Sequence, residues 1–234
     1  IVPVPSHLTK ESFIAEIKVA RAFYYWLLID NFGDVPFVTT TSQELPTITS
    51  KDEIFQSIVN DITSSLAQLS SENNPLMYGR FNKWAAKTLL ANLYLNSIVY
   101  TGKAEWDRCL AECNDIINSE LYRLEENYSD CFHPHNENSA ETIFAIPYDA
   151  INGSGLYLNY TFHSATRYKY NLATTPWGAG SAKAISQFID TYDPDDRRLD
   201  DTWEHGLQYA ADGITPLMCT YDRAGQQLNY SKDL

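Results

Sequence analysis

The stretch that decides the fold is NKWAAKTLLANLYLNSIVYTGKAEWDRCLAECNDIINS, residues 82–119. Apolar residues recur in it at the spacing of a helical face, and they predict one helix over 82–100 and another over 104–119. Gly102 ends the first of them, because glycine readily adopts the left-handed conformation that closes a helix. Alanines on both segments allow close backbone approach, so we expect an antiparallel pair of tetratricopeptide-like geometry.

Two further helices are expected before this pair. Over residues 10–32 apolar residues recur with a period near 3.6, and Gly33 ends the helix. A capping box at 50–53 opens the next helix, which runs to about residue 69. One helix pair cannot bury its own apolar face, so we expect these helices, or segments outside the chain, to stack on it. The residues predicted to face inward on the first helix are Phe13, Ile17, Ala20, Tyr24, Leu27 and Leu28.

The helical pattern gives way after residue 127. The run Glu141–Tyr148 is apolar and predicts a strand. Beyond it, glycine, asparagine and tyrosine are interspersed without a period, apart from a short helix expected over 182–191. We therefore predict an all-α fold, with a tetratricopeptide-like scaffold over 1–149 and an irregular, loop-rich and incomplete ligand-binding portion over 150–234.

The amino-acid composition excludes or disfavours several classes of protein. Hydrophobic residues make up 44% of the 234 residues and charged residues 20%, which excludes intrinsic disorder. The formal net charge of −13 disfavours a nucleic-acid partner. No apolar run approaches the roughly 18 residues that a membrane-spanning helix needs. Aromatic residues reach 13%, and many lie in polar, loop-like sequence, which favours binding. The cysteine spacing predicts free thiols rather than a disulfide framework.

Several blocks of the sequence resemble one known family. They are ARAFYY at 20–25, NFGDVP at 31–36, GRFNKWAA at 79–86, LLANLYL at 89–95 and FIDTYDPDDR at 188–197. In this order they are similar to the signatures of SusD/RagB proteins, the surface lipoproteins of starch- and glycan-utilisation systems. The lipidated start and the terminal helical region of that family have no counterpart here, so we expect an internal fragment of a longer protein.

The resemblance implies a non-catalytic binding protein on the outer face of a Gram-negative outer membrane. Its lipid anchor would lie outside this sequence. It would capture an oligosaccharide and deliver it to a SusC-like TonB-dependent transporter, with no nucleic-acid partner and no cofactor. Three alternatives stay open: a peptide-binding member of the same family, a tetratricopeptide-like protein-interaction scaffold, and a surface glycosidase.

Motifs for catalysis and metal binding are missing. The sequence holds no G-x-S-x-G elbow, Walker loop or H-E-x-x-H. In the histidine pair at 133–135 a proline stands between the two possible ligands, which disfavours a metal site. The acidic turn at 193–204 matches part of a calcium loop, but arginines stand where a ligand and a glycine are needed. We predict instead that Asp193 and Asp196 cap this turn and that Arg197 pairs with a carboxylate.

The candidate sugar site lies in residues 157–177, where aromatic and polar side chains are mixed. Pyranose rings stack their apolar C–H faces on Trp and Tyr, while polar side chains bind the hydroxyl groups. The alternative is that these rings pack the loop portion onto the helices. The candidate carbohydrate-binding residues are Trp177, Tyr157, Tyr160, Arg167, Tyr168, Tyr170 and Asn171.

Two other sets of side chains are assigned to structure. Tryptophans on helix faces are expected in the core: Trp26, Trp84 and Trp106. Cations within the family-like blocks are expected in internal salt bridges or cation–π contacts: Arg21, Arg80 and Lys83.

Overall fold

The computed structural model describes residues 3–41, 45–148, 151, 162–176, 184–220 and 223–230. The chain divides into two compact units, which are described separately. Unit 1 comprises Ile1–Glu125 and Pro134–Pro147, and unit 2 comprises Glu126–His133 and Tyr148–Leu234. The assignment of a scaffold to 1–149 and of a ligand-binding portion to 150–234 stays a prediction.

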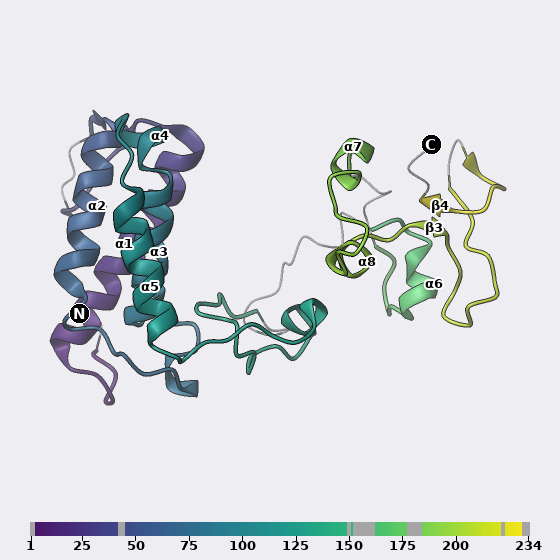
Figure 1. Cartoon of the computed structure of the whole chain (residues 1–234), viewed down its shortest axis with the longest axis horizontal. Helices are drawn as coiled ribbons and strands as arrows, with labels where there is room; N and C mark the ends of the chain where they lie inside the picture. The colour runs from purple at the N-terminus through teal and green to yellow at the C-terminus, as the bar shows by residue number, and fades with distance from the viewer. Residues whose placement is uncertain are drawn as a thin grey trace. The chain divides into compact units, whose positions relative to one another are not determined.

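Unit 1 is a bundle of packed helices (Figure 1). Helix α1 packs along α2 and α3 packs along α5, while α2 also contacts α3 and α4. The α3–α5 pair is the one that the sequence predicts over 82–119, and α1 and α2 form a second pair, as in a tetratricopeptide-like scaffold. The helices are α1 (Lys10–Phe32), α2 (Lys51–Ser65), α3 (Lys83–Leu95), α4 (Ser97–Thr101) and α5 (Trp106–Asn118), and a 3-10 turn, η1 (Pro75–Met77), precedes α3.

The predicted helix ends have local causes in the sequence. Helix α1 ends at Gly33, which takes a φ of +74° and donates its N–H to the carbonyl of Ile29. Ser50 begins α2, where its hydroxyl accepts the backbone N–H of Glu53 at 3.3 Å. Asn82 begins α3 by accepting the N–H of Trp84 and Ala85 at 3.1 and 2.8 Å.

The helix predicted over 82–100 is interrupted, and this part of the prediction is wrong. Asn96 leaves the helical conformation at φ −97° and ψ 9°, which separates α3 from α4. Its side-chain amide donates to the carbonyl of Asn92 at 3.2 Å, so the side chain occupies an acceptor near the end of α3. The predicted stop at Gly102 is confirmed, with a φ of +75° after α4.

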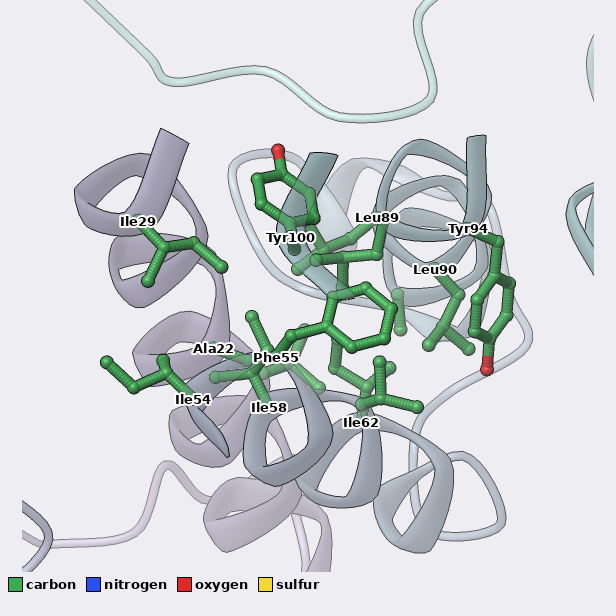
Figure 2. Close-up of a cluster of buried hydrophobic side chains, with 14 of the residues drawn as sticks. Ala22, Ile29, Ile54, Phe55, Ile58, Ile62, Leu89, Leu90, Tyr94 and Tyr100 are labelled. Carbon is green, nitrogen blue, oxygen red and sulfur yellow. The ribbon is translucent and has the colours of Figure 1, made fainter. Parts of the chain in front are cut away.

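The core of unit 1 lies between the helices. Figure 2 shows Phe55, Ile58 and Ile62 of α2 facing side chains of α1 and α3. Tyr100 of α4 belongs to this core, and its hydroxyl donates to Asp30 of α1 at 2.7 Å. Buried apolar side chains from α1, α2, α3 and α4 therefore form one continuous cluster.

The inward face predicted for α1 is wrong in phase, although the helix and its period are right. Ala15, Val19, Ala22 and Ile29 are the apolar residues that α1 buries. The predicted inward residues Ile17 and Tyr24 are 52% and 64% exposed, and Leu27 and Leu28 are 36% and 38% exposed. The small side chains of Ala15 and Ala22 are favoured on this face because they let the backbones of α1 and α2 approach closely, as ridges pack into grooves.

The three helix tryptophans do not share one environment. Trp84 is buried and Trp26 packs against the core, as predicted. Trp106 is 56% exposed on α5, so its assignment to the core is wrong. It lies on the side of α5 that the contact with α3 leaves open, since Cys109 and Glu112 are the residues turned to α3.

The strand predicted over Glu141–Tyr148 is also wrong, because the structure assigns no strand there. Phe144 of this run stacks on Phe81 with ring centroids 4.4 Å apart, while Ile146 and Tyr148 are exposed. The strands of unit 1 among the described residues are short: β1 (Val35–Pro36) pairs antiparallel with β2 (Ile48–Thr49).

Unit 2 is built mainly from loops, as the sequence predicts. Its small apolar cluster contains Ala165, Leu217 and Leu228. The helix predicted over 182–191 is observed only as Ser186–Ile189, and residues 182–183 lie outside the described ones. The elements are η2 (Tyr128–Phe132), α6 (Thr166–Tyr170), α7 (Ser186–Ile189), α8 (Arg198–Thr202), β3 (Gly206–Leu207) and β4 (Asn229–Tyr230), and β3 pairs antiparallel with β4.

Two sequence expectations concern the whole chain. Among the described residues, Cys109, Cys113, Cys131 and Cys219 form no disulfide, in agreement with the cysteine spacing. Among the helices that the structure describes, none combines the length and the apolar character needed to cross a membrane.

Candidate functional site

The predicted sugar-binding residues fall into two groups. Tyr157, Tyr160 and Trp177 lie outside the described residues, so their role stays a prediction. The remaining four, Arg167, Tyr168, Tyr170 and Asn171, lie on α6 or directly after it in unit 2. The short helix therefore brings the described candidates together.

Helix α6 is fixed at its beginning by His163. The backbone N–H of Ala165 donates to the imidazole Nδ1 of His163 at 3.1 Å, and the hydroxyl of Thr166 donates to the His163 carbonyl at 2.7 Å. Ala165 belongs to the apolar cluster of unit 2. The buried side of α6 is therefore held by hydrogen bonds and apolar contacts, while its other side is exposed.

Asn171 ends α6. It takes the left-handed conformation at φ 50° and ψ 41°, and its backbone N–H donates to the Arg167 carbonyl. Asparagine tolerates this conformation better than most residues. Its backbone therefore has a structural role, alongside the binding role predicted for its side chain.

Tyr168 presents an open aromatic ring. The residue is 63% exposed, and the guanidinium carbon of Arg167 lies 6.0 Å from the ring centroid. The Tyr168 carbonyl accepts the N–H of Ala211 at 2.9 Å, which fixes the backbone beneath the ring. Arg167 also donates to the hydroxyl of Thr175 at 3.3 Å. A ring of this exposure beside a guanidinium donor suits a sugar, whose apolar face stacks while its hydroxyls accept.

Tyr170 is held in a network rather than left open. Its hydroxyl donates to Glu204, which also pairs with Lys169, and the Lys169 ammonium donates to Gln208 at 2.9 Å. Burial and then the bond to Glu204 raise the pKa of Tyr170. Burial would raise the pKa of Glu204, but hydrogen bonds from Lys169 and Tyr170 outweigh it and the pKa is lowered. These bonds to Glu204 connect α6 to the segment before β3.

Sequence reasoning missed Lys169, Glu204 and Gln208. Lys169 lies 35 positions from Glu204 and 39 from Gln208, and neither spacing nor composition connects them. The one available signal was a lysine beside two tyrosines at 168–170, which marks a cation among aromatic rings.

The cations assigned to structure are confirmed in that role. Arg21 pairs with Asp61 at 2.5 Å and links α1 to α2. Arg80 pairs with Glu16 at 2.7 Å. The ammonium of Lys83 lies 5.4 Å from the ring centroid of Trp84.

The acidic turn after α7 is a capped turn, as expected. Asp193 accepts the N–H of Asp195 and Asp196 accepts the N–H of Arg198, both at 3.0 Å. The cation on Asp196 is Arg198, at 2.5 Å. The pairing of Arg197 with a carboxylate stays a prediction. Within the described ranges no group of three or more His, Cys, Asp or Glu side chains is arranged to hold a metal ion.

Comparison with known proteins finds similarity to one family. Residues 7–95 match the family model SusD-like_3, described as "Starch-binding associating with outer membrane". The starch-binding protein SusD of Bacteroides thetaiotaomicron is 35% identical over 132 residues, which are 55% of this chain and 24% of that protein. The chain thus spans about a quarter of the length of this relative.

Solved structures share the fold. A SusD superfamily protein from Parabacteroides distasonis has a TM-score of 0.74 and 22% identity, covering 96% of this chain and 48% of that one. Surface glycan-binding protein A from Bacteroides thetaiotaomicron, in complex with laminarihexaose, has a TM-score of 0.65 and 21% identity, covering 81% of this chain and 41% of that one. The predicted all-α, tetratricopeptide-like fold class is confirmed.

Proposed function

We propose that this chain is part of a SusD-like protein that binds an oligosaccharide at the cell surface and does not cleave it. The description of the matching family model, which names starch binding and the outer membrane, supports this proposal. So does the structural neighbour that holds laminarihexaose. The absence of catalytic motifs from the sequence agrees with a role in capture.

The observation that carries the proposal is the exposed ring of Tyr168 on an anchored helix. Tyr168 is 63% exposed, while the N–H of Ala211 bonds its backbone carbonyl and the neighbouring Lys169 side chain pairs with Glu204. A binding surface that is already ordered before the ligand arrives loses less conformational entropy on binding. Arg167 supplies donors for hydroxyl oxygens next to the ring. Trp177, Tyr157 and Tyr160 complete the proposed site from outside the described residues.

The finer parts of the proposal concern the whole protein. The protein of which this chain is part is lipid-anchored in the outer membrane and delivers its ligand to a SusC-like TonB-dependent transporter. Co-purification from solubilised outer membranes tests this partner, with the full-length protein as bait. Recovery of a TonB-dependent transporter supports the proposal, and recovery of cytoplasmic proteins alone contradicts it.

Calorimetry tests glycan capture directly. Full-length protein is titrated with malto- and laminari-oligosaccharides, beside Tyr168→Ala and the control Tyr24→Ala. Tyr24 is 64% exposed on α1, which matches the 63% of Tyr168 but lies in the other unit. We expect Tyr168→Ala to weaken binding about two- to tenfold, the loss of one aromatic contact of roughly 0.5–1.5 kcal/mol. Tyr24→Ala should bind like the wild type.

The alternatives give other outcomes. Binding of peptides but not of glycans indicates the peptide-binding branch of the family. Peptide binding that Tyr168→Ala leaves intact indicates a scaffold that docks partners on its helices. Release of reducing sugar, abolished by one acid-to-amide change, indicates a glycosidase and overturns the proposal.

A further inference from the structure

A cavity lies in unit 1, away from the residues that the sequence assigns to sugar binding. It measures about 410 Å³ and is bounded by residues 73–82 before α3 and by residues 137–145. This volume falls in the range of roughly 300–1,000 Å³ that small-molecule sites occupy. None of the residues that bound it belongs to unit 2.

The inner wall of the cavity is apolar and firmly packed. Met77 is 7% exposed, and Phe144 stacks on Phe81 at 4.4 Å between centroids with an interplanar angle of 21°. Gly79 lies so close to Pro147 that a Cβ on it would be 2.6 Å from the proline Cγ. These contacts tie the two walls together, so the cavity is formed before any ligand binds.

The rim offers neutral hydrogen-bonding groups around one aromatic ring. Tyr78 is 40% exposed, and its hydroxyl makes no hydrogen bond with another described residue. The side chain of Asn138 likewise has no bond within the described part of the chain. Asn73 donates to the Leu121 carbonyl at 3.4 Å, which leaves its side-chain oxygen available. Thr142 adds a hydroxyl.

The charge of the lining restricts the ligand. Among its described residues Glu137 is the one charged side chain, and no Lys, Arg or His lines the cavity. An anionic ligand would find no counter-charge there and would face the Glu137 carboxylate. A polyhydroxylated neutral molecule instead matches amides that both donate and accept, beside a ring for its apolar face.

We propose that this cavity is a second glycan-binding site, which takes one or two rings of a neutral sugar with Tyr78 as its stacking platform and Asn138 and Asn73 as hydroxyl partners. The inference rests on the proposed function, because it assumes that the protein meets a glycan. It adds a binding site on the helical unit and a preference for uncharged sugars.

A fluorescent reporter in the cavity tests the inference at the site itself. In the full-length protein, Tyr78→Trp introduces a tryptophan at the rim, and its acrylamide quenching is measured as a difference from the wild type. We expect laminarihexaose or maltohexaose to protect the introduced tryptophan, and a sulfated laminari-oligosaccharide not to do so. Adding Asn138→Ala should raise the half-saturating sugar concentration about two- to tenfold, the loss of one hydrogen bond. Adding Tyr24→Ala should leave it unchanged.

Parallel calorimetry separates this inference from the proposed function. If a neutral sugar binds with an affinity that depends on Tyr168, but never protects the introduced tryptophan, the second site is wrong and the proposed function stands. If no sugar binds in either assay, both are wrong. Protection by the sulfated probe or by an extended peptide, but not by neutral sugars, overturns the ligand class. Tyr78→Ala, scored by calorimetric stoichiometry, repeats the test without the reporter, and an unchanged stoichiometry contradicts the site.

Discussion

At the scale of single residues, the Glu16–Arg80 pair places two charged side chains in a largely buried environment. The Glu16 side chain is 9% exposed and bonds Arg80 at 2.7 Å, while Glu16 Oε1 and Arg80 Nε find no hydrogen-bond partner among the described residues. Burial raises the pKa of Glu16, and the charge of Arg80 opposes this only in part. The carboxylate is therefore held in the fold against a desolvation cost.

This burial predicts a pH dependence of stability. A carboxyl with a raised pKa in the folded state binds its proton more tightly than in the unfolded chain. Its stabilising contribution is complete below the unfolded value of 4.5 and is lost as the pH rises through the folded pKa. Denaturant unfolding of the wild type and Glu16→Gln across pH 4–8 measures it. The loss of stability above pH 4.5 should shrink in Glu16→Gln, and identical profiles would contradict the assignment.

Two glycines give a second prediction at this scale. Gly79 and Gly102 have φ values of +72° and +75°, but only an added Cβ at Gly79 meets a neighbour, Pro147, at 2.6 Å. Gly102→Ala should cost about 1 kcal/mol, the strain of a left-handed alanine. Gly79→Ala adds a steric clash and should cost about 2–4 kcal/mol. Equal costs, measured by denaturant unfolding, would show that Gly79 has no tight neighbour.

At the scale of elements, the contact between α3 and α5 depends on one buried cation. Lys87 of α3 donates to Glu112 at 2.6 Å and to Asp115 at 2.7 Å, both on α5. Burial lowers the pKa of Lys87, but the hydrogen bonds to Asp115 and Glu112 outweigh it, so the pKa is raised overall. The helix pair thus relies on charge as well as on apolar packing.

The two acceptors of Lys87 form a matched pair for measurement. Glu112 is 16% exposed and Asp115 is 60% exposed in their side chains. Glu112→Gln should cost about 1–2 kcal/mol of unfolding free energy, because it removes a largely buried partner of the ammonium. Asp115→Asn should cost less than about 0.5 kcal/mol, because water screens that contact. A larger cost for Asp115→Asn would contradict the prediction that Glu112 contributes more than Asp115 to the unfolding free energy.

At the scale of the whole molecule, the net charge of −13 on this chain acts on every charged ligand that approaches. It should disfavour acidic glycans and leave neutral ones unaffected. We therefore expect the affinity for laminarihexaose to be the same at 20 and 300 mM salt. The affinity for a sulfated laminari-oligosaccharide should be lower at 20 mM and rise with salt, because ions screen the repulsion. Titration calorimetry at both salt concentrations checks this, and tighter binding of the sulfated ligand at low salt would refute it.

The features that could be predicted from the amino-acid sequence have local or periodic causes. Gly33 and Gly102 end helices because of their own backbone freedom, and Ser50 begins one through a bond to a residue three positions away. The class of fold follows from helical periodicity, and the resemblance to SusD-like proteins from contiguous blocks of residues. Part of the candidate site was accessible in the same way, because Arg167, Tyr168, Tyr170 and Asn171 are neighbours in the chain.

The features that could not be predicted depend on contacts between residues that are distant in the sequence. The inward face of α1 was missed because both of its faces carry apolar residues, and only contact with α2 selects Val19 and Ala22 over Ile17 and Tyr24. Glu204 reaches Tyr170 across 34 positions, and the two walls of the cavity in unit 1 come from segments about 60 residues apart. Periodicity fixes how side chains are arranged around one helix, but packing fixes which of them meet another element.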